Sequence, residues 1–157
     1  MPDQRLKILV VDDDEGVRDS LKVILEDEYD VWDADGGKKA LNVFMSMKPN
    51  LVFLDLVLPD MGGVDVLEKI KRLCPMTPVV ILTAYSNINS ALHAIESGAS
   101  DYIPKPFSVE EIQVRTAELL GNEKNRPLDC ESFRQRWLTR KKDIRERFLT
   151  TAFVPTS

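Results

Sequence analysis

The apolar and polar residues of the chain alternate between two kinds of segment from residue 7 to residue 120. Five short segments, rich in β-branched residues, are typical of strands: 7–11, 29–34, 51–55, 79–83 and 101–104. The segments between them repeat apolar residues every three or four positions, as amphipathic helices do: 17–25, 38–47, 64–73, 88–95 and 112–120. The pattern therefore predicts five strands that alternate with five helices.

This order of elements predicts an α/β domain with a doubly wound, five-stranded parallel sheet. Neighbouring parallel strands need a crossover connection, and the predicted helices supply it. The segments 7–11, 51–55 and 79–83 are almost continuously apolar, which is typical of central strands covered by helices on both faces. The segment 29–34 is more polar, so we expect it at an edge of the sheet.

The composition excludes several classes of protein. The 157 residues are 43% hydrophobic and 30% charged, which favours a globular chain over a disordered one. Two distant cysteines, Cys74 and Cys130, and one histidine, His93, exclude a disulfide scaffold, a Cys/His zinc site and a Ser-His-Asp triad. Without an apolar run of bilayer length or a signal-peptide pattern at the start, we expect a soluble cytoplasmic protein with no membrane insertion.

The charge is distributed unevenly along the chain. The net charge of −5 combines 21 acidic and 12 basic residues over 1–120 with 5 acidic and 9 basic residues over 121–157. We therefore predict a domain over 1–120, a linker over 121–128 and a basic amphipathic helical tail over 129–157. The tail is a C-terminal helical extension of the fold.

Three roles of this tail stay open. It packs on the acidic body or on a second copy, it binds a partner, nucleic acid or an anionic surface, or it is the remnant of a longer protein. Its 37 residues carry no pattern of a zinc finger or a helix-turn-helix, so we do not expect direct DNA binding.

Polar residues at the predicted strand ends point to the chemistry of the domain. Asp12 and Asp13 follow the first strand, Asp55 ends the third, Thr83 ends the fourth and Lys105 follows the fifth. The carboxyl ends of parallel strands meet at one edge of a sheet, where such folds bind ligands. Crowded carboxylates favour Mg²⁺, and one carboxylate can accept a phosphoryl group as a nucleophile. An Asp at a strand end is also a common turn or cap residue, and it is the combination that favours phosphate chemistry.

Four strings at these strand ends are characteristic of a known family. They are ILVVDDDEGVR, LVFLDLVLPDMGG, VVILTAYSN and GASDYIPKPF, and they occur in this order. On these strings, residues 5–120 resemble the receiver domains of two-component response regulators. The resemblance implies the flavodoxin-like (βα)5 fold of CheY-like proteins. It further implies a bacterial, cytoplasmic phosphoprotein of signal transduction rather than an enzyme that acts on a substrate.

The resemblance also implies roles for individual residues. Asp55 would accept the phosphoryl group from a sensor histidine kinase. Asp12, Asp13 and Asp55, with the backbone carbonyl of Val57, would bind Mg²⁺ as the cofactor. Lys105 would pair with Asp55 first and with the phosphoryl group afterwards.

A further set of implied roles concerns the signal that leaves the site. Thr83 would turn toward the phosphoryl oxygen and Tyr102 would reorient with it, which makes these two the predicted switch residues. The Lys105–Pro106 peptide bond is expected to be cis. The surface of the fourth helix, fifth strand and fifth helix, over 87–120, would then change its interactions. The partners would be a second copy of the phosphorylated chain, a downstream effector protein or an output domain absent from this chain.

Other functions fit the sequence less well. A Mg²⁺-dependent aspartate-nucleophile phosphohydrolase resembles D-x-D-x-[TV], whereas Leu56 and Val57 follow Asp55 here, so the second acid is missing. A nucleotide-binding domain needs a glycine-rich loop after the first strand, and this sequence has three aspartates there. A receiver-like interaction module that is not phosphorylated would not need the complete set of residues.

Overall fold

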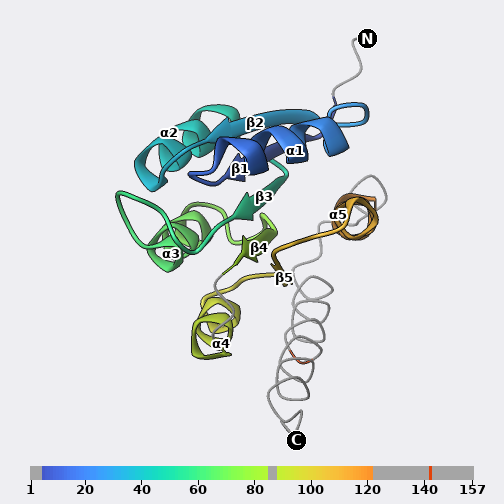
Figure 1. Cartoon of the computed structure of the whole chain (residues 1–157). Helices are drawn as coiled ribbons and strands as arrows, with labels where there is room; N and C mark the ends of the chain where they lie inside the picture. The colour runs from blue at the N-terminus through green and yellow to red at the C-terminus, as the bar shows by residue number, and fades with distance from the viewer. Residues whose placement is uncertain (1–4, 85–87, 122–141, 143–157) are drawn as a thin grey trace, which may run out of the picture.

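The computed structural model of the chain describes residues 5–84, 88–121 and 142. Over these residues five strands alternate with five helices (Figure 1). The strands are β1 (Lys7–Val11), β2 (Asp30–Ala34), β3 (Leu51–Leu54), β4 (Val79–Thr83) and β5 (Asp101–Pro104). The helices are α1 (Glu15–Leu25), α2 (Gly37–Met47), α3 (Gly63–Leu73), α4 (Ile88–Glu96) and α5 (Val109–Leu120). Apart from Gly121 and Lys142, the predicted linker and tail lie outside the described residues.

The strands form one parallel sheet in the order β2-β1-β3-β4-β5. This confirms the predicted doubly wound α/β fold, and β2 lies at an edge as its polar sequence indicates. The chain leaves β1 toward β2 and then returns past β1 to β3, so the direction of winding reverses between β1 and β3. A crevice for ligands forms at such a switch point, outside the carboxyl ends of the strands.

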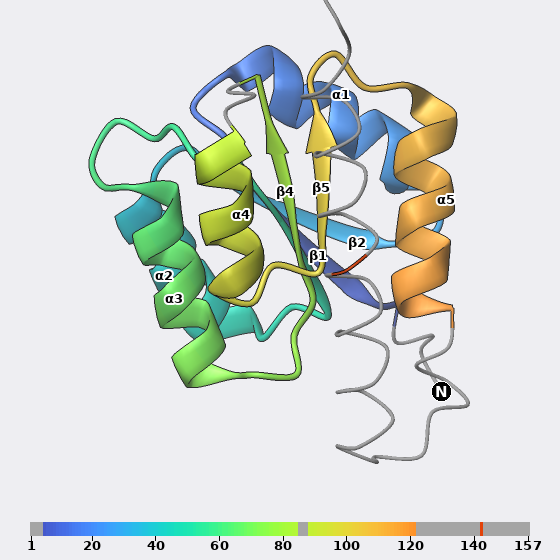
Figure 2. The same cartoon turned by 90° about the horizontal axis from the view of Figure 1, so that it is seen from below.

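Helices cover both faces of the sheet. The pair α1 and α5 packs on one face, and α2, α3 and α4 pack on the other (Figures 1 and 2). Successive strand residues point to opposite faces, so each strand contributes to two cores. The core under α1 and α5 contains Ile8, Val10, Leu51, Phe53, Val80, Leu82 and Ile103, and the other contains Leu9, Val11, Val52, Leu54, Val79, Ile81 and Tyr102. Burial on both faces explains the continuous apolar runs of the central strands.

The helices α1 and α5 begin two and three residues before their first predicted apolar positions, Val17 and Ile112, because a polar cap precedes each helix. Asp14 accepts a hydrogen bond from the Gly16 N–H at 2.8 Å, and α1 begins directly after it. Ser108 accepts from the Glu111 N–H at 3.0 Å at the start of α5. Both side chains satisfy a backbone donor that the first helical turn leaves without a partner. Among the helices described, none is long and apolar enough to span a membrane.

Candidate functional site

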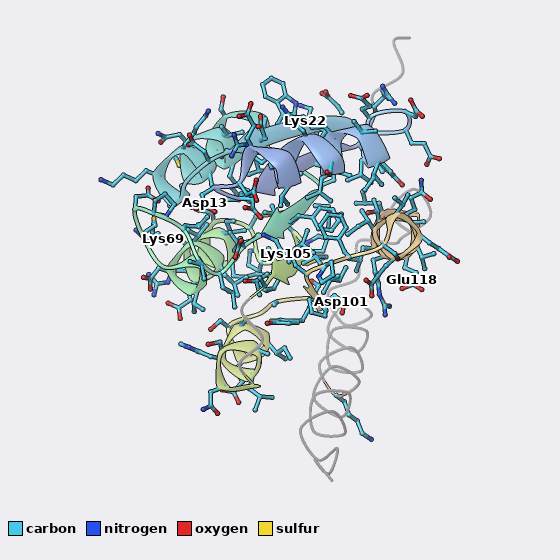
Figure 3. The ribbon with its side chains drawn as sticks, viewed as in Figure 1. Asp13, Lys22, Lys69, Asp101, Lys105 and Glu118 are labelled. Carbon is cyan, nitrogen blue, oxygen red and sulfur yellow. The ribbon has the colours of Figure 1, made fainter. Side chains whose placement is uncertain are left out.

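Four strands, β1, β3, β4 and β5, bring polar side chains together at the carboxyl edge of the sheet. Lys105, which follows β5, places its Nζ 2.6 Å from Asp12 Oδ2 and 2.9 Å from Asp55 Oδ2. Thr83, the last residue of β4, donates its hydroxyl to Asp55 Oδ1 at 2.8 Å. Figure 3 shows the labelled Asp13 and Lys105 side chains at this edge. The residues predicted from the strand ends therefore meet in one place.

The Asp55 carboxylate is held at both of its oxygens. Oδ1 accepts from the Thr83 hydroxyl and, at 3.0 Å, from the backbone N–H of Val57, while Oδ2 faces Lys105. The Asp55 N–H donates to the Val11 carbonyl at 3.0 Å, which fixes the residue just beyond the end of β3. Only 6% of Asp55 is exposed. These contacts leave the carboxylate little freedom to rotate, so its two oxygens have a fixed orientation at the edge of the sheet.

Three carboxylates form the acidic part of this site. Oxygens of Asp12, Asp13 and Asp55 lie within 4.8 Å of one another, with Asp13 exposed and the other two buried. Burial raises the pKa of Asp12, and the neighbouring Asp55 charge raises it further, although hydrogen bonds from Lys105 and the Asp14 N–H lower it. When all are ionised, the carboxylates outnumber the single ammonium of Lys105 by two charges. A divalent cation with hard oxygen ligands fits this donor set.

Lys105 stays charged in this setting. Burial by itself would lower the pKa of Lys105, but hydrogen bonds to Asp12 and Asp55 and their charges outweigh it, so the pKa is raised. The Lys105 N–H donates to the Thr83 carbonyl at 2.9 Å, which ties the residue to the end of β4. The Lys105–Pro106 peptide bond is cis. The lysine is thus placed by backbone contacts and held by two carboxylates.

Tyr102 lies beneath the site rather than in it. It is only 1% exposed and packs in the core that α2, α3 and α4 cover, with Ala91, Ala94 and Ile95 of α4. Burial, together with the charge of Asp55, raises the pKa of Tyr102 to about 12. The side chain therefore connects the surroundings of Asp55 with α4.

The sequence reasoning missed Arg18, which supports the acidic loop from α1. Its Nη1 donates to the Asp12 carbonyl at 2.7 Å, and its Nε pairs with Asp33 Oδ2 of β2 at 2.9 Å. Lys22 reaches the other Asp33 oxygen at 3.0 Å. Although burial opposes it, these two cations lower the pKa of Asp33. The signal available in the sequence was the position of Arg18 in the DDDEGVR string, one helical turn after Asp14.

Comparison with known proteins gives the same family from sequence and from structure. The response regulator receiver domain family matches residues 8–117. The response regulator MprA of Mycolicibacterium vanbaalenii is 37% identical over 116 residues, which cover 73% of this chain and 50% of that protein. The probable transcriptional regulator ycf27 of Porphyridium aerugineum is 39% identical over 118 residues, 74% of this chain and 49% of that protein. The chain thus spans about half the length of the curated relatives it matches.

Solved structures agree with this similarity. A CheY-like response regulator receiver domain protein from Methanospirillum hungatei JF-1 superposes with a TM-score of 0.74 at 33% identity, covering 78% of this chain and 100% of that one. The BeF3-activated DrrB receiver domain gives a TM-score of 0.71 at 34% identity and covers 75% and 99% of the two chains. NtrX from Brucella abortus, in complex with ADP, gives 0.72 at 31% identity, with 84% of this chain and 32% of that longer chain covered.

Proposed function

The chain belongs to the response regulator receiver domain family, and from this premise we propose that Asp55 accepts a phosphoryl group from the phosphohistidine of a sensor histidine kinase. The observation that supports this most directly is the set of contacts on the Asp55 carboxylate. Thr83 and Val57 hold Oδ1, and Lys105 holds Oδ2, at the edge where parallel sheets bind ligands. These donors are of the kinds that stabilise phosphoryl oxygens.

The transfer needs few groups of the protein. An Asp55 oxygen attacks the phosphorus, a P–O bond forms, and the P–N bond to the kinase imidazole breaks. Lys105 then exchanges its contact with Asp55 for a contact with a phosphoryl oxygen. Thr83 likewise moves its hydroxyl donor from the carboxylate to the phosphoryl group. Both residues start within hydrogen-bond distance of Asp55, so only short movements are required.

The cofactor we propose is Mg²⁺. The side chains of Asp12, Asp13 and Asp55 would hold it, with the backbone carbonyl of Val57 as a further ligand. The excess of two negative charges at the site supports a divalent ion, and the clustered carboxylate oxygens suit a hard cation. When bound, the ion neutralises charge on the transferring group.

The signal would leave the site through Thr83 and Tyr102. Thr83 is bonded to Asp55, and Tyr102 packs against α4, so a change at Asp55 has a path toward α4 and β5. Asp101 of β5 forms an ion pair with Arg115 of α5 at 3.1 Å, which connects α5 to β5. We propose that α4, β5 and α5 form the surface that recognises a second copy, an effector protein or an output domain.

In this role the chain promotes only its own phosphorylation and dephosphorylation, in the cytoplasm, and acts on no separate substrate. The second acid that an aspartate-nucleophile phosphohydrolase would need two residues after Asp55 is replaced by Val57. The complete set of polar residues around Asp55 equally disfavours a module that is never phosphorylated.

To test the proposed role of Asp55, the full chain is treated with acetyl phosphate and Mg²⁺, and its intact mass and size-exclusion elution volume are measured. We expect one added phosphoryl group, which is lost in Asp55→Ala. The matched control is Asp30→Asn, which removes an exposed carboxylate from β2 and should be phosphorylated like the wild type. A phosphoryl group retained by Asp55→Ala would show that another residue is the acceptor.

A further inference from the structure

The helix α2 begins without a cap of its own. Its N-cap residue is Gly36, which has no side chain to accept a backbone hydrogen bond. Asp60, from the loop between β3 and α3, does so instead. Its Oδ1 accepts from the Gly37 N–H at 2.8 Å and its Oδ2 from the Lys38 N–H at 2.9 Å. The bonds from Lys38 and Gly37 lower the pKa of Asp60, so the carboxylate is ionised at neutral pH.

The space at the start of α2 is shaped for this loop. A Cβ on Gly36 would lie 2.9 Å from Asp60 Oδ1, so the carboxylate occupies the place that an N-cap side chain would take. A Cβ on Gly37 would overlap the side chain of Met61, the next residue of the loop. Two consecutive glycines therefore allow the loop to rest directly on the first turn of α2.

The same loop begins at the proposed phosphoryl acceptor. Val57 donates its N–H to Asp55 Oδ1 at 3.0 Å, and the Gly63 N–H donates to the Leu56 carbonyl at 3.0 Å. A Cβ on Gly63 would overlap the backbone of Asp55 and Leu56, so the two ends of the loop lie against each other. Between these ends, Val57, Pro59 and Asp60 are exposed. The contact with α2 fixes the exposed part of the loop to the first turn of a helix that packs on the sheet.

We propose that Asp60 is a positioning residue of the phosphoryl-transfer site. By capping α2 from the loop, it fixes Val57, and with it the backbone that holds Asp55 and would bind Mg²⁺. This inference rests on the proposed function of Asp55 and Mg²⁺. Asp60 then affects the site by fixing the position of the loop, in addition to stabilising α2.

The decisive experiment separates two roles of Asp60, as the cap of α2 and as the link between α2 and the loop. Asp60→Ala removes both. Gly36 has an extended conformation with φ −161° and ψ 172°, which a serine adopts readily as an N-cap. In the Asp60→Ala background the space next to Gly36 is free for the side chain of a serine. The double variant Asp60→Ala/Gly36→Ser therefore gives α2 a cap of its own without a link to the loop.

The probe is Mg²⁺ alone, titrated into the full chain by calorimetry, with thermal unfolding in EDTA as the measure of stability. We expect Asp60→Ala to lower the melting temperature and to weaken Mg²⁺ binding about tenfold or more, as loss of an outer positioning contact does. The double variant should recover the melting temperature while its Mg²⁺ affinity stays weak. Asp60→Asn, which keeps one oxygen acceptor, should fall between the wild type and Asp60→Ala.

Two controls separate other causes. Ser108→Ala removes the cap of α5, which packs on the opposite face of the sheet from α2, and should keep the wild-type Mg²⁺ affinity within about twofold despite a lower melting temperature. Asp65→Asn removes an exposed charge next to the loop, at the start of α3, and measures the effect of charge alone.

Recovery of wild-type Mg²⁺ affinity in the double variant would overturn the proposal, because Asp60 would then be only a helix cap. An unchanged affinity in Asp60→Ala would overturn it as well. Failure of the proposed function is a separate result: the wild-type chain would then bind Mg²⁺ but gain no phosphoryl group from acetyl phosphate. The Mg²⁺ affinities of the variants decide the role of Asp60 in that case too.

Discussion

Two lysines at opposite edges of the same sheet have opposite electrostatic surroundings. Lys105, at the carboxyl edge, lies between Asp12 and Asp55, and its pKa is raised. Lys71, near the end of α3 at the amino edge, donates to the carbonyls of Thr77 and Pro75 at 2.5 and 3.4 Å. Burial lowers the pKa of Lys71 to about 8. Within the part of the chain that the structure describes, no carboxylate lies within ion-pair distance of Lys71.

The two lysines reflect a difference in charge between the two edges of the sheet. At the carboxyl edge, buried carboxylates are close enough to repel one another, and an ammonium partly balances them. At the amino edge lies a cavity of about 490 Å³, lined by apolar residues such as Phe44, Leu73 and Met76 and also by Lys48 and Asn50. The carboxyl edge thus has an excess of negative charge that a ligand can balance, whereas the described residues of the amino edge include no such cluster of carboxylates. Substitutions of the two lysines should therefore have different consequences.

The largest effect is expected from Lys105→Met. This change keeps an unbranched side chain of nearly the same length but leaves Asp12 and Asp55 buried and facing each other without the Lys105 ammonium. We expect the free energy of unfolding at pH 7 in EDTA to fall by about 3–5 kcal/mol, the cost of removing one partner from a buried ion pair. Urea denaturation measures it. Adding Asp12→Asn to the variant should restore part of the loss, and a loss below about 1 kcal/mol would contradict the contrast between the edges.

A second effect concerns Mg²⁺, which should stabilise the protein through the carboxyl edge only. At a concentration 100 times its dissociation constant, Mg²⁺ should raise the free energy of unfolding by about 2.7 kcal/mol. Lys71→Met should keep this gain. Asp13→Asn should lose most of it, because the exposed Asp13 is a proposed ligand, while the ion pairs of Lys105 are with Asp12 and Asp55. Urea denaturation with Mg²⁺ and with EDTA tests this, and an equal gain in Asp13→Asn would place the ion elsewhere.

The smallest effect at neutral pH is expected from Lys71→Met. Among the described residues no carboxylate pairs with the ammonium of Lys71, so its loss removes a partly buried charge and two hydrogen bonds without leaving an unpaired carboxylate. We expect the free energy of unfolding at pH 7 to change by no more than about 1 kcal/mol. A loss as large as that of Lys105→Met would break the comparison.

The same variant has a distinct pH dependence. The pKa of Lys71 is about 8 in the folded chain, below the value of 10.5 for a lysine free in water. Between these values the unfolded chain binds more protons, so the stability of the wild type should rise with pH relative to Lys71→Met. At about one pH unit below the folded pKa and lower, Lys71 is protonated in both states and the difference should be constant. Urea denaturation from pH 7 to 10.5 measures this, with Lys69→Met, on the exposed side of the same helix, as the matched control.

Much of the fold could be predicted because its elements depend on short-range patterns. The bounds of β1, β4 and β5 follow from apolar runs that end at a polar residue or a proline. The meeting of Asp55 with Lys105 could also be predicted, since parallel strands bring their carboxyl ends to one edge. The exposed position of His93 follows from its place on the polar side of α4.

The contacts that the sequence did not reveal depend on the path of a loop or on depth in the fold. Asp60 caps a helix that begins 23 residues earlier in the chain, and only the folded loop brings the two together. Lys71 looks like an ordinary surface residue of an amphipathic helix, yet its side chain packs against Gly98, whose φ is +110°. Neither arrangement follows from residue type or local period.

The bond between Lys105 and Asp12 joins residues 93 positions apart, and their strands are not neighbours in the sheet. Asp12 therefore gains its partner Lys105 only after almost the whole domain has been synthesised. Contacts of such long sequence separation also slow folding, because a large loop must close before they form. A nascent or partly folded chain would consequently lack the complete phosphoryl-transfer site that we propose, so that the site and the fold are completed together.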